Sequence, residues 1–393
     1  MLTGDKLETA KCIGVCTGFK SEYQSFFEIS TTNDEEILSL LADFDTENHC
    51  LVVTGSAIEV IFRDSFLVES FLDKSKKAKS VILCRCAPKQ KAQVARAIKE
   101  KYNKVVCCIG DGGNDVGMIQ ESNVGIGIEG KEGLQASLAS DVSVRRFMDI
   151  EMLFLWHGRL SYLRTSKLSN FVVHRGLIIT TIQTIFIVVF YYVSINIYNG
   201  FLIMGYSTIF TNLPVFALIL DQDIPMRQAL NYPILYNHVQ KGKNMNFTVF
   251  LKWLWKSIFQ GSAIIILSIL LMSNTFTEIV TITFTALIFI EFLNIASMIR
   301  TWHKYIFMSI VISLIVYFFC LIFLRRLFLL SVLKIEDFFK ICLLSIVTWI
   351  PFQAYQSVQR TFFPEKIDIV INEAKIEEKR LEKKRNTKHE RNI

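Results

Sequence analysis

The segment Cys107–Ile119, with the sequence CCIGDGGNDVGMI, constrains the fold of this chain more than any other stretch. The apolar run at 105–109 predicts a buried parallel strand, because it is too short for a helix and ends at Gly110. A polar turn, GDGGND, follows this strand, and a helical pattern begins at Val116. In open α/β sheets, ligands bind beyond the carboxyl ends of the strands, so the turn is a candidate ligand site.

The residues of this turn suit a phosphate group and a magnesium ion. Asp111 and Asp115 offer the hard carboxylate oxygens that Mg²⁺ takes, and Asn114 can hydrogen-bond a phosphate oxygen. A turn without any ligand is the alternative interpretation, and it explains an isolated GDG equally well. The complete GDGGND after a buried strand favours the phosphate and Mg²⁺ interpretation.

Lys91 is the candidate cation for the same site. It follows a predicted strand at 81–84, in the segment CRCAPKQKA. A phosphoryl group needs a fixed positive charge to offset the charge that develops during its transfer. Taken alone, Arg85, Lys89 and Lys91 would be a solvated basic face, but beside GDGGND we interpret Lys91 as catalytic.

The first residues of the chain form another candidate phosphate contact. Thr3, Gly4 and Asp5 lie between an apolar pair, Met1-Leu2, and a helical pattern over 7–15. The free backbone N–H groups at such a helix N-terminus can cradle a phosphate. Met1-Leu2 therefore indicates the end of a strand, and we expect the chain to begin partway through a fold.

The pattern up to residue 153 predicts an α/β doubly wound parallel sheet, because strands alternate with helices. Besides those already named, strands are predicted at 51–54, 124–128 and 141–144. Residues 19–48 are predicted to be a polar and irregular insertion that contains one helix at 34–44.

Within this insertion, Asp43-Phe44-Asp45-Thr46 has the DxDxT form of the nucleophile loop in soluble haloacid-dehalogenase phosphatases. The apolar residues before it have helical spacing, not the continuous run of a strand. Too few residues also separate it from the strand at 51–54 for a parallel crossover. A phosphatase fused to a membrane anchor is therefore a minor alternative.

The composition of the rest of the chain is that of a membrane protein. Hydrophobic residues make up 51% of the chain, Phe alone contributes 32, and the mean hydropathy is +0.37. We expect a stalk at 154–170, a transmembrane region at 171–358 and a basic cytosolic tail at 359–393. About six spans of ~20 residues each are predicted, at 171–193, 201–220, 247–272, 281–299, 305–324 and 338–358.

An even number of spans places the tail on the same side of the membrane as the soluble part. The positive-inside rule agrees for four basic residues and disagrees for four others. The agreeing residues are Lys241, Lys243, Arg300 and Lys304, and the disagreeing ones are Arg325, Arg326, Lys334 and Lys340. The tail interleaves glutamates with its basic residues, which favours a solvated arm over a nucleic-acid binder.

Polar residues interrupt the first two predicted spans. Arg175 and His174 lie early in the first span, where they either snorkel to the headgroups or face the bundle interior. In the second span, Pro214 is expected to break a helical hydrogen bond beside Asn212. Such interruptions often mark a transport path, although many are only packed kinks.

Glu291 and Asn294, in the fourth predicted span, are expected to face protein or a water-filled path. The spans lack a set of carboxylates that could strip water from a metal cation. Asp221 and Asp223 lie at the expected cytosolic end of the second span, not at mid-depth.

Together these motifs resemble the P-type ATPases, and among them the type IV subfamily of phospholipid flippases. LTGDKLETA (2–10), CRCAPKQKA (84–92) and the segment from GDGGND to SDVSV (110–144) are similar to motifs of that subfamily. HGRLSY (157–162), FVVHRGLI (171–178) and LPVFALILDQD (213–223) resemble its branch that works without an accessory subunit.

The resemblance implies a haloacid-dehalogenase-like phosphorylation domain that uses ATP and Mg²⁺. In the soluble part, it implies that Thr3, Gly4 and Asp5 contact phosphate and nucleotide, that Arg85 lies near the ribose, and that Lys91 binds the transferred phosphoryl group. It further implies that Asp111 and Asp115 bind Mg²⁺ and that Asn114 contacts a phosphate oxygen. In the membrane part, it implies that Arg175, Asn212 and Pro214 line the lipid path. Many flippases have a lysine at the position of Arg175.

The family moves phospholipids from the outer or lumenal leaflet to the cytosolic leaflet through an aspartyl-phosphate cycle. The resemblance implies a multi-pass protein of eukaryotic endomembranes (Golgi or endosome) or of the plasma membrane. No DKTGT motif occurs in the chain. We therefore expect the C-terminal part of a pump, unable to form a phosphoenzyme alone, with the missing half supplied by a longer chain or a separate one.

Two further functions stay open at this point. One is a P-type pump for cations or polyamines, of which this chain would again be a part. The other is a non-catalytic membrane subunit that binds a partner carrying the missing half.

Overall fold

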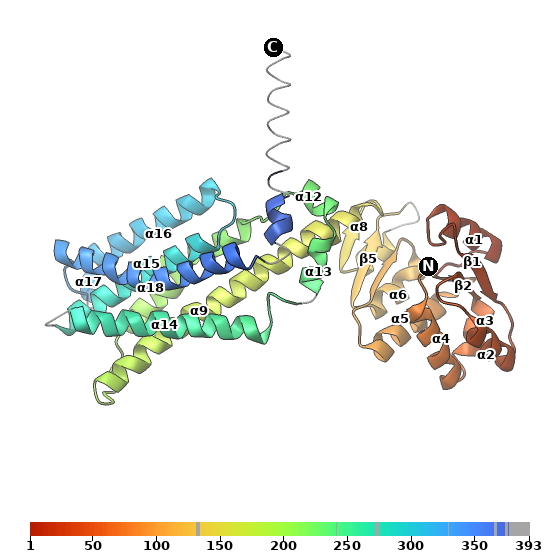
Figure 1. Cartoon of the computed structure of the whole chain (residues 1–393), viewed down its shortest axis with the longest axis horizontal. Coiled ribbons are helices and arrows are strands. Elements are labelled where there is room, and N and C mark those ends of the chain that lie inside the picture. Colours follow the sequence, from red (N-terminus) through yellow and green to blue (C-terminus); the bar gives the residue numbers. More distant parts are fainter. Residues whose placement is uncertain are drawn as a thin grey trace, which may run out of the picture. The chain divides into compact units, whose positions relative to one another are not determined.

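The computed structural model describes residues 1–130, 134–240, 242–271, 275–328, 330–364, 368–373 and 376. The chain divides into two compact units, Met1–Ile150 and Glu151–Ile393 (Figure 1). We call the first the α/β unit and the second the helical unit. Most of the predicted tail, 359–393, lies outside the described residues.

Within the described residues, the α/β unit contains two parallel sheets of three strands each. Their orders are β1-β2-β3 and β4-β5-β6, and every pairing is parallel. The strands are β1 (Ser25–Ile29), β2 (His49–Thr54), β3 (Val81–Cys84), β4 (Cys107–Gly110), β5 (Val124–Ile128) and β6 (Val142–Val144). The strand predicted before the GDGGND turn and those predicted at 51–54, 81–84, 124–128 and 141–144 are confirmed. The strands at 81–84 and 124–128 have the predicted bounds.

Helices connect these strands and cover them. They are α1 (Leu7–Cys16), α2 (Asp34–Asp43), α3 (Gly55–Ile61), α4 (Ser65–Lys77), α5 (Pro88–Tyr102), η1 (Gly113–Asp115), α6 (Val116–Glu121), α7 (Gln135–Ala139) and α8 (Asp149–Met152). Strand β2 is buried on both faces: Leu51 and Val53 pack in a cluster with α3 and α4, while Cys50 and Val52 pack with Ala10 of α1. Helices on both faces of a parallel sheet are the mark of a doubly wound arrangement.

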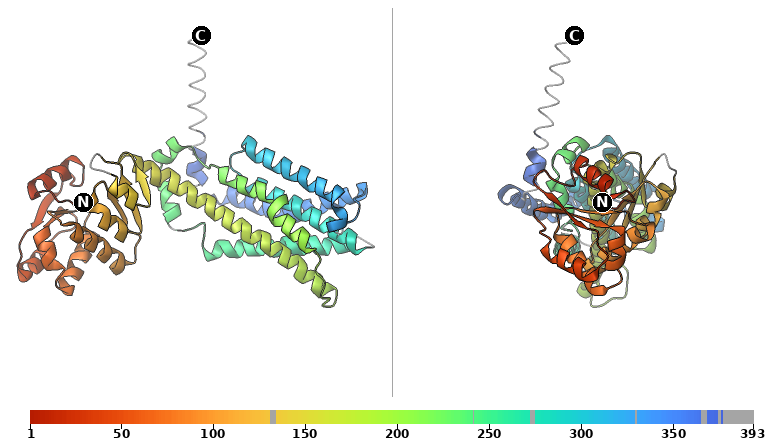
Figure 2. Two further views of the ribbon diagram at one scale, coloured as in Figure 1. Left: turned by 180° about the vertical axis from the view of Figure 1, so that it is seen from behind. Right: turned by 90° about the vertical axis from the view of Figure 1, so that its right-hand side faces the viewer.

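One continuous sheet was expected, and the two separate sheets correct that expectation. Leu2 forms a parallel bridge with Leu83 at the edge of β3. Within the described residues, no strand joins Leu2 to β4, so the pairing stops on either side of this position. Figure 2 shows the strands of the α/β unit from behind and from the side.

The predicted irregularity of 19–48 is wrong. This segment contains β1, which pairs with β2 from Ser25↔His49 to Ile29↔Val53. Ile29 is fully buried, and the Phe27 ring lies 5.5 Å from the Phe44 ring. Burial of these apolar side chains outweighs the polar composition of the segment.

The helical unit contains five helices that are long and apolar enough to cross a membrane, within the residues described. Its elements are η2 (Leu153–Gly158), α9 (Arg159–Val189), α10 (Gly200–Gly205), η3 (Tyr206–Phe210), α11 (Asn212–Ala217), η4 (Leu218–Leu220), α12 (Met226–Asn231), α13 (Ile234–Gln240), α14 (Phe247–Leu271), α15 (Phe276–Met298), α16 (Lys304–Phe323), α17 (Arg325–Phe328) and α18 (Ile335–Phe362). The most enclosed of the five is α15, which packs against α14 and α18.

These five helices coincide with the first five predicted spans. The sixth prediction, 338–358, falls on α18, which is helical but is not among the five. Lys340 and Pro351 interrupt its apolar stretch. A sixth span therefore stays a prediction, as does the side of the membrane on which each loop lies.

Candidate functional site

A largely buried ion pair lies at the end of β4. Lys91, on the first turns of α5, is 7% exposed, and its Nζ donates to Asp115 Oδ1 at 2.8 Å. Pro88 begins α5, where its fixed φ suits the first helical position. Gly110, which ends β4 and begins the turn, must be glycine, because a Cβ there would lie 2.3 Å from the Asp115 Cβ. The turn and α5 thus hold a cation and a carboxylate in contact.

The Thr3-Gly4-Asp5 turn is tied to the loop after β3. The backbone N–H of Cys86 donates to Thr3 O at 3.0 Å, and that of Arg85 donates to Asp5 O at 3.0 Å. Thr3 Oγ1 donates to Asp5 Oδ2 at 2.6 Å and accepts from the Asp5 N–H at 3.1 Å. The structure therefore brings these predicted residues together with Arg85, at the start of the loop that leads to Lys91.

Arg85 has a left-handed backbone, with φ of 53°, and an exposed side chain. A Cβ on Gly55, after β2, would lie 2.1 Å from Arg85 O, so only glycine allows this close approach. Gln90 Nε2 donates to Gly55 O at 2.8 Å, and its Oε1 accepts from the Ala87 N–H at 2.9 Å. The sequence analysis missed Gly55 and Gln90, although a glycine at a strand end was a usable signal.

Asp111 and Asn114 are exposed, and neither side chain makes a hydrogen bond or ion pair among the residues described. Within the same residues, no hydrogen bond joins Asp111 to Lys91 or to Thr3. Mg²⁺ is usually held by one or two carboxylates, with water and phosphate oxygens as its other ligands. The unpaired Asp111 carboxylate and the second oxygen of Asp115 fit that donor set. The described residues hold no group of three or more His, Cys, Asp or Glu side chains around one point.

The DxDxT segment does not follow a strand. Asp43 is the last residue of helix α2 and is exposed. Asp45 accepts from the Glu47 N–H and the Asn48 side chain, and these hydrogen bonds hold the pKa of Asp45 below its usual value. The helical spacing predicted before this segment is confirmed, which leaves the GDGGND turn as the stronger candidate.

In the helical unit, His174 and Arg175 are buried inside the bundle. His174 is fully buried, and Arg175 is 8% exposed, so the snorkelling alternative is wrong. Arg175 donates to Tyr206 O at 3.0 Å, hydrogen-bonds the Thr211 hydroxyl, and lies over the Tyr206 ring at 5.0 Å. Its charge therefore faces the second span.

The second span is discontinuous, but the break does not lie at Pro214. The helix changes to a π-helix at Tyr206–Phe210 and resumes at Asn212, with Thr211 in a non-helical conformation between them. Pro214 lies in the first turn of α11, where its missing N–H would have had no intrahelical partner. Thr211 Oγ1 donates to the Tyr206 carbonyl at 2.6 Å.

A chain of buried polar side chains runs through the bundle. Asn294 Nδ2 contacts His174 Nε2 at 3.2 Å and donates to Gln260 Oε1 at 3.0 Å, while His174 Nδ1 contacts Ser257 Oγ at 2.6 Å. Separately, Tyr206 donates to Glu291 Oε1 at 2.7 Å.

Asn294 and Glu291 are fully buried, which confirms that they face protein. The sequence analysis missed Gln260, Ser257 and Tyr206, although the first two are polar residues within a predicted span.

Comparison with known proteins finds a matching family model and several similar sequences. Residues 137–365 match the family described as Phospholipid-translocating P-type ATPase C-terminal. The chain is 43% identical over 93% of its length to a zebrafish (Danio rerio) protein named Probable phospholipid-transporting ATPase IIB. It is 38% identical over 93% of its length to Phospholipid-transporting ATPase neo1 of Schizosaccharomyces pombe. The matches cover 32% and 35% of these relatives, so the chain spans about a third of their length.

Proposed function

We propose, from the premise that this chain belongs to the phospholipid-translocating P-type ATPases, that it is the C-terminal part of an ATP-driven phospholipid flippase. The complete pump would move phospholipid from the outer or lumenal leaflet to the cytosolic leaflet of a eukaryotic endomembrane or plasma membrane. The observation that carries the proposal is the largely buried pair of Lys91 and Asp115, in one chain whose described residues include five membrane-compatible helices. The α/β unit would belong to a cytosolic, haloacid-dehalogenase-like phosphorylation domain.

In this function, Lys91 holds a positive charge beside the transferred phosphoryl group, and Asp115 fixes the position of its ammonium. Asp111 and Asp115 would hold Mg²⁺, which when bound neutralises charge on phosphoryl oxygens. The other assignments are Thr3, Gly4 and Asp5 for phosphate and nucleotide, Asn114 for a phosphate oxygen, Arg85 for the ribose, and Arg175, Asn212 and Pro214 for the lipid path. The assignment of Thr3, Gly4 and Asp5 is supported by their proximity to the loop that leads to Lys91. The assignment of Arg175 is supported by its burial beside the broken second span.

A cavity in the α/β unit supports the proposal that a strand with the phosphorylated aspartate comes from elsewhere. The cavity has a volume of about 430 Å³ and is mostly apolar, with Leu2 and Leu83 on one side and Val106 and Cys108 on the other. Val94 of α5 also lines it. Unpaired strand edges accept a further strand readily. A parallel strand between Leu2 and β4 would join the two sheets and end beside the GDGGND turn.

The strand could come from a preceding part of a longer chain or from a separate polypeptide. By itself the chain should form no phosphoenzyme, because it contains no DKTGT motif. The isolated chain, incubated with Mg²⁺ and ATP carrying a radiolabelled γ-phosphate, should acquire no acid-stable label that hydroxylamine removes. Such a label would contradict the proposed need for an outside aspartate.

The activity itself is tested with Lys91→Met and a matched control, Lys89→Met, because both residues lie in the first turns of α5 and Lys89 is exposed. ATP hydrolysis is measured in membranes that retain any partner polypeptide. Phospholipid should stimulate hydrolysis, Lys91→Met should lower it by about 10²–10³-fold, as for loss of one preorganised electrostatic donor, and Lys89→Met should leave it unchanged. Stimulation by a cation or polyamine instead of lipid would select the other pump, and no hydrolysis with any partner would select a non-catalytic subunit.

A further inference from the structure

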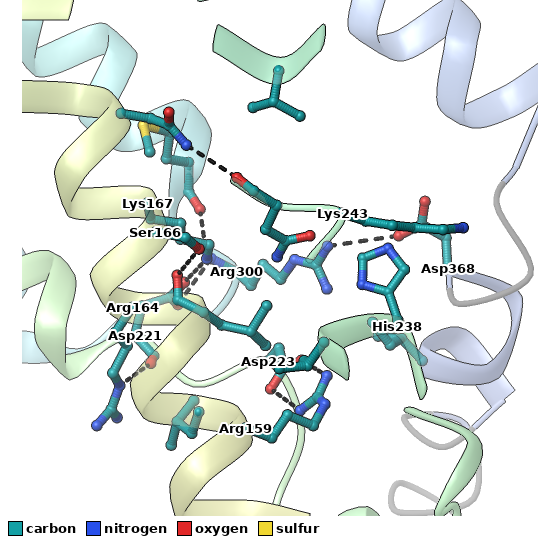
Figure 3. Close-up of a pocket in the computed structure, with 18 of the residues that line it drawn as sticks. Arg159, Arg164, Ser166, Lys167, Asp221, Asp223, His238, Lys243, Arg300 and Asp368 are labelled. Carbon is teal, nitrogen blue, oxygen red and sulfur yellow. Dashed lines mark hydrogen bonds and ion pairs between the residues drawn. The ribbon is translucent and has the colours of Figure 1, made fainter. Parts of the chain in front are cut away.

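The helical unit contains a cavity lined by charged side chains, with a volume of about 320 Å³ (Figure 3). It lies where the first half of α9, the segment 221–249 and the end of α15 meet. Arg159, Leu163 and Lys167 line it from one face of α9, because residues four apart lie above one another on a helix. Val249 and Trp253, on α14, form an apolar part of the wall.

Positive charge exceeds negative charge around this cavity. Its lining contains five cationic side chains, Arg159, Arg164, Lys167, Lys243 and Arg300, and three carboxylates, Asp221, Asp223 and Asp368, with His238 beside them. A concave surface of one charge sign concentrates counter-ions. The excess of cations therefore favours an anionic ligand.

The two carboxylates nearest α9 are already paired within the protein. Asp221 accepts from Lys167 Nζ at 2.6 Å and from the backbone N–H groups of Arg300 and Thr301, both at 3.0 Å. Asp223 is paired through both of its oxygens with the guanidinium of Arg159. Burial raises the pKa of Asp223, but hydrogen bonds from Arg159 and its charge outweigh burial, so the pKa lies below its usual value. Both carboxylates are thus paired with cations of the protein, and so they offer little repulsion to an anion.

Several cationic donors keep free capacity. Arg164 donates through Nε to Asp221 O at 3.0 Å, and its terminal nitrogens have no partner among the described residues. The Arg300 guanidinium lies 3.6 Å from the Asp368 carboxylate. Figure 3 marks this ion pair with a dashed line. Lys243 is exposed and makes no ion pair in the described part of the chain. The buried Nε of Arg159 is also without a partner there. Guanidinium groups match the geometry of phosphate oxygens.

We propose that this cavity binds a phosphate group through Arg164, Arg300 and Lys243, as a site distinct from the one around Lys91. The group we assign to it is the headgroup phosphate of an anionic phospholipid. The apolar wall supports this choice, because Val249 and Trp253 belong to a membrane-compatible helix and would contact the glycerol and first methylenes of a lipid. Free inorganic phosphate shares the charged contacts but has nothing to place against that wall.

The full chain in detergent is titrated by calorimetry with three probes: short-chain phosphatidic acid, short-chain phosphatidylcholine and inorganic phosphate. Saturable binding of phosphatidic acid alone assigns the site to a lipid headgroup. Binding of inorganic phosphate with equal affinity assigns it to the phosphate group without the lipid. Equal binding of phosphatidylcholine and phosphatidic acid overturns the proposal, because the site would then not distinguish an anionic headgroup from a zwitterionic one.

Variants place the binding at this cavity. Arg164→Gln should weaken phosphatidic acid about tenfold, the usual effect of losing one charged hydrogen bond. Lys304→Gln is the matched control, since Lys304 is an exposed cation of the same unit outside the cavity, and it should bind as the unchanged chain does. Asp368→Asn should strengthen binding, because it removes the carboxylate that competes for Arg300. A misfolded variant cannot bind more tightly, so unchanged or weaker binding by Asp368→Asn contradicts the proposal.

Discussion

The α/β unit and the helical unit place their polar side chains in opposite ways. Of the described residues in the α/β unit, the buried polar side chains are Gln24, Thr54 and Lys91. The helical unit fully buries many more, Gln260 and Asn294 among them. Parallel strands end at the surface, where polar groups meet water, but a spanning helix has no water along its length. In the bundle, polar side chains must therefore satisfy one another inside.

The apolar side chains show the same contrast in reverse. In the α/β unit, Leu51, Val53 and Ile82 are all fully buried in the core. In the helical unit, α16 leaves Ile315 and Phe323 more than 60% exposed. Such exposure is costly in water and favourable in lipid. Single polar contacts should consequently matter more for stability in the helical unit than in the α/β unit.

The largest effect is expected at the buried pair of Arg159 and Asp223. Asp223→Ala would leave a buried guanidinium without its partner, and the free energy of unfolding should fall by about 3–5 kcal/mol. Thermal and denaturant unfolding in detergent measures this loss. Arg227→Ala, which removes an exposed arginine of the same unit, is the control and should change little.

The pH dependence of this pair follows from the lowered pKa of Asp223. A depressed carboxyl pKa gives stability that is present above the unfolded pKa and lost as the pH falls through the folded value. The contribution should hold from neutral pH down to about pH 4 and disappear below it. In Asp223→Ala, unfolding should lose this part of its acid dependence. An unchanged acid profile would mean that the pair is not ionised in the folded protein.

A smaller loss is expected from Asn294→Leu. This change leaves Gln260 and His174 without their shared partner in the bundle interior, at a cost of about 1–3 kcal/mol. Thr180→Val serves as the control, because Thr180 is exposed on α9 and its hydroxyl bonds only the local Leu177 carbonyl. If both variants unfold alike, the contrast between the two units does not hold for uncharged groups.

In the α/β unit, Asp64→Ala should cost about 1 kcal/mol through loss of a helix cap. Asp64 precedes α4, and its Oδ1 accepts from the Phe66 N–H at 3.0 Å. Asp64→Asn keeps the acceptor and should remain close to the unchanged chain. If Asp64→Ala lowered the free energy of unfolding as much as Asp223→Ala does, polar groups that face water and polar groups inside the bundle would contribute equally to stability.

The mildest effect concerns thiol reactivity at the cavity of the α/β unit. Cys107 lines this cavity and is exposed, and Cys12 is an exposed cysteine elsewhere in the same unit. Both should react with a thiol reagent in the isolated chain. Cys107 should react more slowly, because partial burial of its thiol raises the pKa of Cys107. In an assembly that supplies the missing strand, Cys107 should become protected while Cys12 stays reactive. Equal reactivity of Cys107 in both states would argue against a strand at that position.

Much of the candidate site was predictable because its residues are close in sequence. The GDGGND turn follows a strand whose apolar run is unambiguous, so its place at a strand end needed no tertiary information. The sequence predicted that Lys91 and Asp115 belong to the same site, but not that they are in contact, because 24 positions separate the two residues. Strand β1 was missed because its burial depends on pairing with β2, which local composition does not reveal.

The sequence by itself determined strands β2 to β6, the positions of the five membrane-compatible helices among the described residues, and the place of the GDGGND turn at a strand end. These properties depend on neighbouring residues and on their spacing. Only the tertiary structure decided that Arg175 faces inward, that the second span breaks at Thr211, and that cations from α9 and the end of α15 surround one cavity. Such outcomes depend on which distant side chains can satisfy a polar group without water, and the linear order of residues does not specify them.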